Sequence, residues 1–562
     1  MNYSIKPNIY IDFKRYSSEL GIHVWFDYGI EGFDDILSIL RASGGSWNKE
    51  YLTWFVKGEF AFYCIDLIKT VGKFNVLCGD FLTYYTNTIL KKMERGVVAS
   101  KRKKPMSKIE IPCPDGLSYF DFQKAAVEFF NNRNKSILLA DDMGLGKTIT
   151  AIAIANYNKY KKILVICPDS AKDRVWRNEI EKWYMYEKNI CVVYSGKPYD
   201  NSANIVIINY DLISKYKEIL ISSKFTYLIS DEAHMLKTPG SKRTKTFKAI
   251  ANSINNKILL TGTPILNRPV ELYSLVRILS GEFGNYVNYA FRYCNAKLVK
   301  LGESDKVYLD DKGYSNLSEL NFKLRSTLMM RREKADVLEE FPNINRVVFN
   351  IDADYSIDIE KKYKEEKRRY TTELSEVKKK KREYFDYASY TKAIKKTHRY
   401  HFEKISLIRH DLGINKIPDI IAFINKIFDS DVNKVVLFLH HRDVIDAIKD
   451  AFVNESVVVY GGMNSREKAK AVNSFEEDKS IKLFIGSIQA SGIAYTLTIA
   501  HTVVFGELDW TPSMVYQCEG RCVRLGQKFP VDIYYLIVNN SLDQNMMHKI
   551  DSKGRIIKSI MV

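Results

Sequence analysis

The sequence predicts an α/β protein built from two lobes, each containing a doubly wound parallel sheet. Short runs of valine, isoleucine and leucine recur along the chain, as expected for strands that are buried on both faces. Polar turns and helical patterns follow these runs, and strands that alternate with helices favour parallel sheets. The runs form two separate series, which indicates two lobes. A glycine-rich turn follows the first run, where ligands bind in such folds.

The expected strands of the first lobe lie at residues 136–140, 162–167, 204–209, 225–230 and 257–260. Those of the second lobe lie at residues 434–440, 456–460, 481–486, 502–505 and 532–538. Between the two series, residues 354–404 contain few aliphatic side chains and dense charge of both signs. Mixed charge at helical spacing predicts long, exposed helices that connect the lobes or protrude from them.

The composition is that of a globular protein with several domains. The chain has 562 residues, of which 46% are hydrophobic and 27% charged. No apolar run reaches the roughly 18 residues that a membrane helix needs, and residues 1–7 lack a signal-peptide pattern. The cysteines show no Cys-x-x-Cys spacing, and no second pair stands near Cys518 and Cys522 to complete a zinc site. We therefore expect a cytoplasmic or nucleoid-associated protein, nuclear in a eukaryote, with no membrane partner.

The charge balance points to a polyanion. Lysine and arginine total 85 against 67 acidic residues, which gives a net charge of +18 and a pI near 9.2. Cationic side chains that neutralise phosphates release condensed counterions, so a polyanion such as a nucleic acid is one expected partner. The alternative is that the charge only promotes solubility.

Residues 138–148 read LLADDMGLGKT, an apolar run that enters a glycine-rich turn. Glycines let backbone N–H groups approach a phosphate, the Lys147 ammonium adds a positive charge, and the Thr148 hydroxyl is a ligand for Mg²⁺. The usual pattern has glycine where Asp141 stands. The residues expected to bind ATP here are Asp142, Met143, Gly144, Leu145, Gly146, Lys147 and Thr148.

Two carboxylates, Asp231 and Glu232, follow the fourth expected strand. A carboxylate at the carboxyl end of a strand holds Mg²⁺, often through water. The adjacent glutamate orients or deprotonates an attacking water. We therefore expect Asp231 to share the Mg²⁺ ion with Thr148 and Glu232 to act in catalysis beside Lys147.

Near the C-terminus, Gln517, Arg521 and Arg524 are spaced at i, i+4 and i+7. On a helix this spacing places all three on one face. Two guanidinium groups on one face suit a polyphosphate, the chemistry of an arginine finger. The alternative is an exposed face that forms salt bridges.

These motifs, in this order, resemble those of superfamily 2 helicases and, within them, the Swi/Snf group of DNA translocases. The segments that carry the resemblance are the Q motif at 119–123, motif Ia at 166–183, motif II at 231–234, motif III at 260–267, the end of the first lobe at 330–338, and the end of the second lobe at 509–512 and 517–527. The similarity extends over about residues 115–550.

The resemblance implies two RecA-like lobes with ATP and Mg²⁺ between them. It implies that Gln123 reads the adenine, and that Gly492 and Gln517 contact the nucleotide. The residues that would couple hydrolysis to DNA are Thr261, Gly262 and Thr263. The residues that would contact DNA are Pro168, Asp169, Ser170, Asn209, Tyr210, Ser487 and Trp510. Motif V departs from its usual Gly-Gly-x-Gly-Leu core, because residues 490–495 read ASGIAY. Side chains at such a close-approach position would loosen the coupling.

Residues 291–297 and 439–442 resemble the annealing-helicase subgroup, and the N-terminal region resembles the HARP domain of that subgroup. We expect there a strand, a helix at 32–42, a hairpin bearing Trp47 and Trp54, and a helix near 59–70. The two tryptophans would stack on exposed DNA bases. The alternative is that they fill a small core.

The predicted organisation is a HARP-like domain with α+β structure (1–98), a basic linker (99–114), a first lobe (115–345), a charged helical connector (346–415) and a second lobe (416–562). The predicted function is an ATP-driven, monomeric translocase on duplex, forked or junction DNA that rewinds strands, migrates branches or regresses forks. Low sequence specificity follows, because the backbone rather than the bases is contacted. The alternatives are a strand-separating helicase and a non-catalytic clamp gated by ATP.

Overall fold

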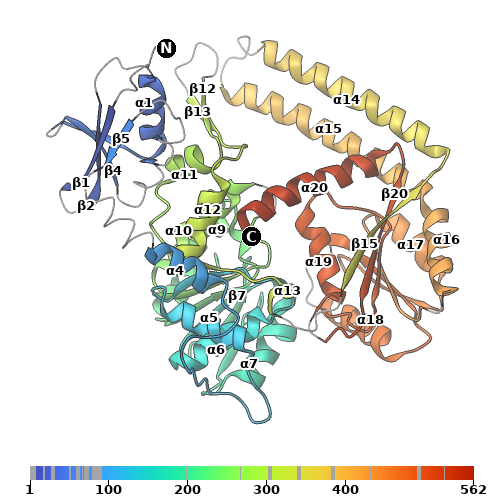
Figure 1. Cartoon of the computed structure of the whole chain (residues 1–562). Coiled ribbons are helices and arrows are strands. Elements are labelled where there is room, and N and C mark those ends of the chain that lie inside the picture. The colour runs from blue at the N-terminus through green and yellow to red at the C-terminus, as the bar shows by residue number, and fades with distance from the viewer. Residues whose placement is uncertain are drawn as a thin grey trace.

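The computed structural model describes residues 8–16, 19–26, 32–49, 52–57, 64–65, 68, 75–78, 91–197, 199–265, 268–300, 307–337, 343–380, 387–430, 432–489, 495–524 and 526–561. Among these residues, no helix is long and apolar enough to cross a lipid bilayer. Figure 1 shows the two lobes, a long helical hairpin and a small N-terminal domain.

The first lobe contains a seven-stranded sheet with the order β14-β6-β11-β10-β7-β9-β8, in which every pairing is parallel. Its strands are β6 (Ser136–Leu139), β7 (Ile163–Cys167), β8 (Ile190–Val192), β9 (Ile205–Asn209), β10 (Tyr227–Ser230), β11 (Asn256–Leu260) and β14 (Met329–Met330). Its main helices are α5 (Asp121–Asn131), α6 (Lys147–Asn158), α7 (Asn178–Trp183), α8 (Lys217–Ser222), α9 (Lys242–Asn252), α10 (Tyr273–Leu279), α11 (Tyr286–Tyr293) and α12 (Leu317–Thr327).

Helices cover both faces of this sheet, because successive strand residues point to opposite sides. Ile137 of β6 packs in a cluster with residues of α5 and α6, whereas Leu138 packs in a second cluster with residues of α9, α10 and α12. Both faces are therefore buried, which explains the continuous apolar runs in the sequence.

The second lobe contains a six-stranded, all-parallel sheet with the order β15-β20-β19-β16-β18-β17. Its strands are β15 (Ile344–Ile351), β16 (Val435–Leu439), β17 (Ser456–Val459), β18 (Leu483–Ser487), β19 (Thr502–Phe505) and β20 (Val531–Val538). Its helices are α16 (Ile417–Phe428), α17 (Arg442–Ala451), α18 (Ser465–Glu477), α19 (Pro512–Cys522) and α20 (Leu542–Met561).

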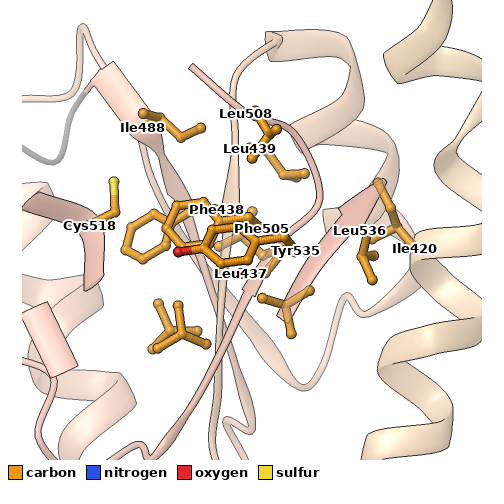
Figure 2. Packing of buried hydrophobic residues seen from close by; sticks show 14 of the residues in the cluster. Ile420, Leu437, Phe438, Leu439, Ile488, Phe505, Leu508, Cys518, Tyr535 and Leu536 are labelled. Carbon is orange, nitrogen blue, oxygen red and sulfur yellow. The ribbon is translucent and has the colours of Figure 1, made fainter. Parts of the chain in front are cut away.

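Three aromatic rings from neighbouring strands stack in the core of the second lobe (Figure 2). The rings of Phe438 and Phe505 lie 5.4 Å apart, and those of Phe505 and Tyr535 lie 5.1 Å apart. Figure 2 also shows Cys518 of α19 facing this core. The core therefore fixes the helix that carries Arg521.

All ten expected strands are confirmed, each within two residues of its predicted ends. Strands β8 and β14 were not predicted because they contain only three and two residues. Strand β15 was also missed, and here the predicted domain boundary at 345/346 falls inside a strand that pairs with β20 along its whole length. Since β15 is an edge strand with six consecutive exposed residues, it shows no continuous apolar run.

The charged region between the lobes forms two long helices, α14 (Tyr355–Lys379) and α15 (Tyr387–Asn415), as predicted. They run side by side and extend away from the sheet of the second lobe (Figure 1). Ion pairs such as Lys362–Asp411, at 2.9 Å, join the two helices.

The N-terminal domain is a five-stranded sheet with the order β3-β4-β2-β1-β5 and one helix on a face. Its elements are β1 (Asn8–Tyr16), β2 (Glu19–Trp25), α1 (Phe33–Ala42), β3 (Ser46–Asn48), β4 (Thr53–Lys57) and β5 (Asn75–Cys78). The helix expected at 32–42 and the tryptophan hairpin are confirmed. The helix expected near 59–70 falls mostly outside the described residues.

Two contacts tie distant parts of the chain to the first lobe. Helix α4 (Lys91–Ser100) spans the predicted boundary at 98/99 and packs on α12. Gly96 allows this close packing, because a side chain at its position would collide with the Ser326 backbone. Helix α20 of the second lobe reaches back to α12, where the Asn321 side chain donates to the Ile560 carbonyl at 2.6 Å. Ile560 is buried in the core of the first lobe.

A candidate nucleotide site between the lobes

The glycine-rich turn between β6 and α6 forms a tight cradle at the start of α6. Gly144 and Gly146 have φ angles of +86° and +68°, a region that glycine enters without steric cost. Gly146 precedes Lys147, the first residue of α6. The Lys147 ammonium donates to the carbonyls of Asp141 and Asp142 at 2.8 and 3.1 Å. A helix N-terminus and a half-buried ammonium together suit a phosphate group.

Asp141, which occupies a position where glycine is usual, is part of a buried ion pair. Its carboxylate accepts three hydrogen bonds from Arg332, two of them at 3.0 Å from the backbone N–H and the Nε–H. Both side chains are 1% exposed. The departure from the usual pattern therefore places a fully paired carboxylate in the turn, and loss of its cation would leave an uncompensated buried charge.

Asp231 and Glu232 lie directly after β10, near the cradle. The Trp176 indole donates to Asp231 at 2.9 Å, and so does the Glu232 backbone N–H. Glu232 has a φ of +47°, a conformation that costs energy for a residue with a side chain. Such strain is typical of functional sites, because the surrounding structure must impose it.

Burial and neighbouring charges separate the pKa values of these two acids. Burial raises the pKa of Asp231, and the adjacent negative charge of Glu232 raises it further. Burial also acts to raise the pKa of Glu232, but the hydrogen bond and charge of His234, together with Lys147 and Arg521, outweigh it and lower the pKa. Glu232 is therefore the acid that stays ionised most readily.

His234 connects the acids to the segment after β11. Its Nδ1 lies 3.2 Å from a Glu232 oxygen and 3.3 Å from the Thr261 hydroxyl. The same hydroxyl accepts a hydrogen bond from the Thr263 N–H at 3.1 Å. Gly262, between the two threonines, leaves room for Met143 and for the Lys147 ammonium. This network places the predicted coupling residues against the cradle.

Gln123 lies on the other side of the cradle. Its side chain is buried, its oxygen accepts from the Phe120 N–H at 3.0 Å, and its amide nitrogen faces Gly146. The structure thus brings Gln123 to the turn, and its role in reading adenine stays a prediction.

The second lobe contributes two arginines. Arg521 lies in the last turn of α19, and its charge acts on Glu232. Arg524 lies beyond the helix end at Cys522, so it does not continue the predicted helical face. Its side chain instead turns back and donates to the Gly520 carbonyl at 2.7 Å, where its methylene packs against Gly144 of the cradle.

The two lobes therefore meet at the cradle. A side chain at Gly520 would touch Met143, and one at Gly144 would touch Arg524. Burial lowers the pKa of Arg524 to about 9, and the neighbouring Arg521 charge adds to this effect, while Glu232 opposes it. Two guanidinium groups and one ammonium converge on a site with several carboxylates, an arrangement that an anion such as a polyphosphate would complete. Gln517 is buried on the same helix.

The donors near the cradle fit Mg²⁺, which prefers oxygen ligands. Thr148 is in the first turn of α6, and Asp231 is a half-buried carboxylate whose charge acts on Lys147. The predicted nucleotide contact Gly492 lies outside the described residues, as does most of the divergent motif V.

The predicted DNA contacts differ in their exposure. Pro168, Asp169 and Ser170 lie at a surface turn after β7. Tyr210 is buried and donates to the Asp231 carbonyl at 2.6 Å, so its side chain is turned toward the acids, and its contact with DNA stays a prediction. Asn209, at the end of β9, and Ser487, at the end of β18 in the second lobe, are buried. Trp510 of the second lobe packs under Lys549 of α20 at 4.6 Å.

The two tryptophans of the N-terminal domain also differ. Trp47 is 49% exposed, whereas Trp54 packs against the core of that domain. Their rings lie 6.0 Å apart, with Trp47 on the outside. The core-filling alternative therefore describes Trp54, and only Trp47 offers a free ring face.

Four side chains of this site had no predicted role. Trp176, Arg331, Arg332 and Lys334 all contact the cradle or its acids. Each lies inside a segment quoted for its resemblance, but the contacts join positions more than 50 residues apart. Only the pairing of β14 with β6 brings the last three into place.

Comparison with known proteins agrees with this geometry. Residues 122–401 match the SNF2-related domain, and residues 415–526 match the helicase conserved C-terminal domain. Fold and site thus define a two-lobed helicase-like protein. The chain belongs to the SNF2 family.

Two curated relatives are each 31% identical to the chain over 78% of its length. One is the DNA annealing helicase and endonuclease ZRANB3 of Bos taurus, of which the chain covers 40%. The other is the SWI/SNF-related matrix-associated actin-dependent regulator of chromatin subfamily A-like protein 1 homolog of Caenorhabditis elegans, of which it covers 61%. The chain thus spans about half the length of these relatives. A solved Sulfolobus solfataricus SWI2/SNF2 ATPase core in complex with dsDNA aligns with 82% of this chain and 94% of its own, at 21% identity and a TM-score of 0.36.

Proposed function

We propose that this chain is a DNA-dependent ATPase that translocates on duplex DNA and rewinds or remodels it. The observation that carries the proposal is the meeting of Lys147 and Glu232 from the first lobe with Arg521 and Arg524 from the second. The name of one relative, a DNA annealing helicase, supports strand rewinding as the activity.

In this proposal, ATP binds between the lobes with its phosphates at the start of α6. Lys147 and the N–H groups of the cradle hold the phosphates. Thr148 and Asp231 would hold Mg²⁺, which neutralises phosphate charge when bound. Gln123 and Gln517 would position the rest of the nucleotide.

Glu232 would orient the attacking water, because its lowered pKa keeps the carboxylate ionised and able to accept a hydrogen bond from that water. Arg521 and Arg524 stabilise the negative charge that develops on the transferred phosphoryl group. Because they belong to the other lobe, hydrolysis would be fast only when the lobes are closed.

Loss of the γ-phosphate would remove the anion that holds the two lobes together. The chain of contacts from Glu232 through His234 to Thr261 offers a route by which that change reaches the loops beside DNA. We propose that the surface turn at 168–170 contacts the DNA backbone, which gives low sequence specificity.

We propose that the protein is a monomer that associates with DNA in the cytoplasm or nucleoid, or in the nucleus of a eukaryote. The N-terminal domain would recognise forked or junction DNA through Trp47, whose exposed ring is free to stack on a base.

The test measures ATP hydrolysis without DNA and with single-stranded, duplex and forked DNA. We expect duplex to stimulate hydrolysis, and we expect Glu232→Gln to abolish the stimulation. Glu187→Gln, an exchange of the same kind at a position without a role in the site, is the matched control. Wild-type hydrolysis no faster than that of Glu232→Gln would favour the ATP-gated clamp. Separation of forked strands without annealing would favour a strand-separating helicase.

A further inference from the structure

The segment that leaves the first lobe, residues 331–334, lies along the nucleotide cradle. Strand β14 pairs with β6, and the hydrogen-bond ladder continues past both strands. The Ala140 N–H donates to the Met330 carbonyl at 2.7 Å, and the Asp142 N–H donates to the Arg332 carbonyl at 3.1 Å. The exit segment and the cradle therefore form one continuous backbone unit.

Side chains of this segment hold the cradle on two sides. Arg331 donates to the Asp142 carboxylate at 3.1 Å, to the Ala140 carbonyl at 2.8 Å and to the Gly262 carbonyl at 3.3 Å. Arg332 holds Asp141 in the buried ion pair. The exit segment thus contacts both the cradle and the segment after β11 that contains the coupling residues.

Lys334 extends this contact to the second lobe. Its backbone N–H donates to the Asp142 carboxylate at 3.3 Å, and its ammonium donates to the carbonyl of Val523. Val523 caps the carboxyl end of α19 and immediately precedes Arg524. One residue therefore links the nucleotide cradle to the end of the helix that carries the arginines.

The environment of Lys334 favours its contact with the end of α19. The side chain is 9% exposed, and a cation at the carboxyl end of a helix interacts favourably with its free carbonyls and its dipole. Burial lowers the Lys334 pKa to about 8. The negative charge of Asp142 opposes that fall, whereas Arg524 and Lys147 add to it.

We propose that Lys334 is a positioning residue that fixes the end of α19 against the cradle and so places Arg524 and Arg521 on the phosphates. The proposal rests on the proposed ATPase function. It goes beyond that function because it assigns Lys334 an indirect effect on hydrolysis, through Val523 and the arginines.

The first test replaces the ammonium while keeping the volume. We expect Lys334→Met to lower kcat for duplex-stimulated hydrolysis about 10- to 100-fold with KM for ATP nearly unchanged, as for a group that acts in the transition state. Lys334→Arg keeps a charged donor and should restore most of the rate. Lys434→Met is the matched control, because Lys434 is equally buried and also donates to backbone carbonyls, but far from the cradle. It should destabilise the second lobe and leave kcat unchanged.

A double-mutant cycle tests whether Lys334 acts through Arg524. The variant with both Lys334→Met and Arg524→Ala should lose less rate than the product of the two single losses, because part of the effect of Lys334 passes through Arg524 and the rest through Arg521. Losses that multiply would overturn the proposal, and so would a kcat for Lys334→Met equal to that of Lys434→Met.

A binding measurement tests the role of Lys334 independently of whether the protein hydrolyses ATP. In the wild type, a non-hydrolysable ATP analogue should slow amide hydrogen exchange in residues 517–524, and in Lys334→Met this protection should be lost. Wild-type protein without DNA-stimulated hydrolysis would refute the proposed function alone. Unchanged protection in Lys334→Met would refute the role of Lys334 alone.

Discussion

Each lobe has a glutamate after a strand of its sheet, and the two glutamates have opposite surroundings: Glu507 is buried, whereas the Glu232 side chain is 31% exposed. Glu232 follows the central strand β10, and Glu507 follows β19 in the second sheet. Glu507 accepts hydrogen bonds from the N–H groups of His440 and His441 at 2.7 and 2.9 Å, and His441 Nδ1 lies 2.6 Å from its other oxygen.

Glu232, in contrast, has a strained backbone and faces cations of both lobes. The hydrogen-bond partners named above for the Glu507 carboxylate all belong to its own lobe, as expected for a structural residue. Asp141, paired with Arg332 inside the first lobe, belongs with Glu507 in this respect. The role of an acid is therefore indicated less by its burial than by whether its hydrogen-bonding and ionic partners come from its own lobe or from both lobes.

The largest expected effect separates the two glutamates. Glu232→Gln should lower kcat for duplex-stimulated hydrolysis by about 10²- to 10⁴-fold with little change in stability. Glu507→Gln should leave kcat near the wild-type value and destabilise the second lobe by about 1–3 kcal/mol, because a buried hydrogen-bonded carboxylate is lost. Steady-state kinetics and urea unfolding measure both effects. Equal kinetic losses in the two variants would break the comparison.

The second prediction concerns the paired acid of the first lobe. Arg332→Met leaves the Asp141 charge buried without its cation and should destabilise the first lobe by about 3–5 kcal/mol. Adding Asp141→Asn should recover most of that stability, since the uncompensated charge is removed. Urea unfolding of the two variants measures this. No recovery in the double variant would show that Arg332 stabilises the lobe through its other contacts.

A smaller effect is expected at Trp176, which donates to Asp231. Trp176→Phe removes this hydrogen bond and should raise the Mg²⁺ concentration that gives half-maximal hydrolysis about tenfold, as for other groups that orient a metal ligand. Trp183→Phe, a buried tryptophan of the same lobe, is the control. A tenfold change in both variants would point to general loss of packing.

The smallest effect on hydrolysis is expected from the N-terminal domain. Deletion of residues 1–90 retains α4, which packs on the first lobe, and should leave duplex-stimulated hydrolysis within about twofold because the deleted domain lies away from the cradle. Annealing and fork remodelling should fall about tenfold or more, because one of two DNA-binding modules is lost. Unchanged fork activity would reject the role assigned to this domain.

Much of this architecture was predictable because buried parallel strands leave continuous apolar runs. The runs at 162–167 and 502–505 match β7 and β19 within one residue. Strand β15 escaped because an edge strand exposes its side chains. The cradle and the acids were predictable because their residues are contiguous in the sequence, whereas the partners of Asp141 and Asp142 lie about 190 residues away and depend on strand order.

The carboxyl end of α19 also could not be predicted from the sequence. The i, i+4, i+7 spacing suggested a single helical face, but α19 ends at Cys522. Arg524 still reaches the cradle because its side chain folds back to the Gly520 carbonyl. The spacing identified residues that lie near the cradle, but it gave the wrong helical geometry for Arg524.

The packing of Ile560 of α20 in the core of the first lobe has a mechanical consequence. The lobes are joined once by the chain that runs from β14 to β15 and again by this helix. Two bodies hinged at two separate points rotate about the line between those points and resist swinging apart in other directions. The second attachment would therefore restrict the relative motion of the lobes to rotation about one axis.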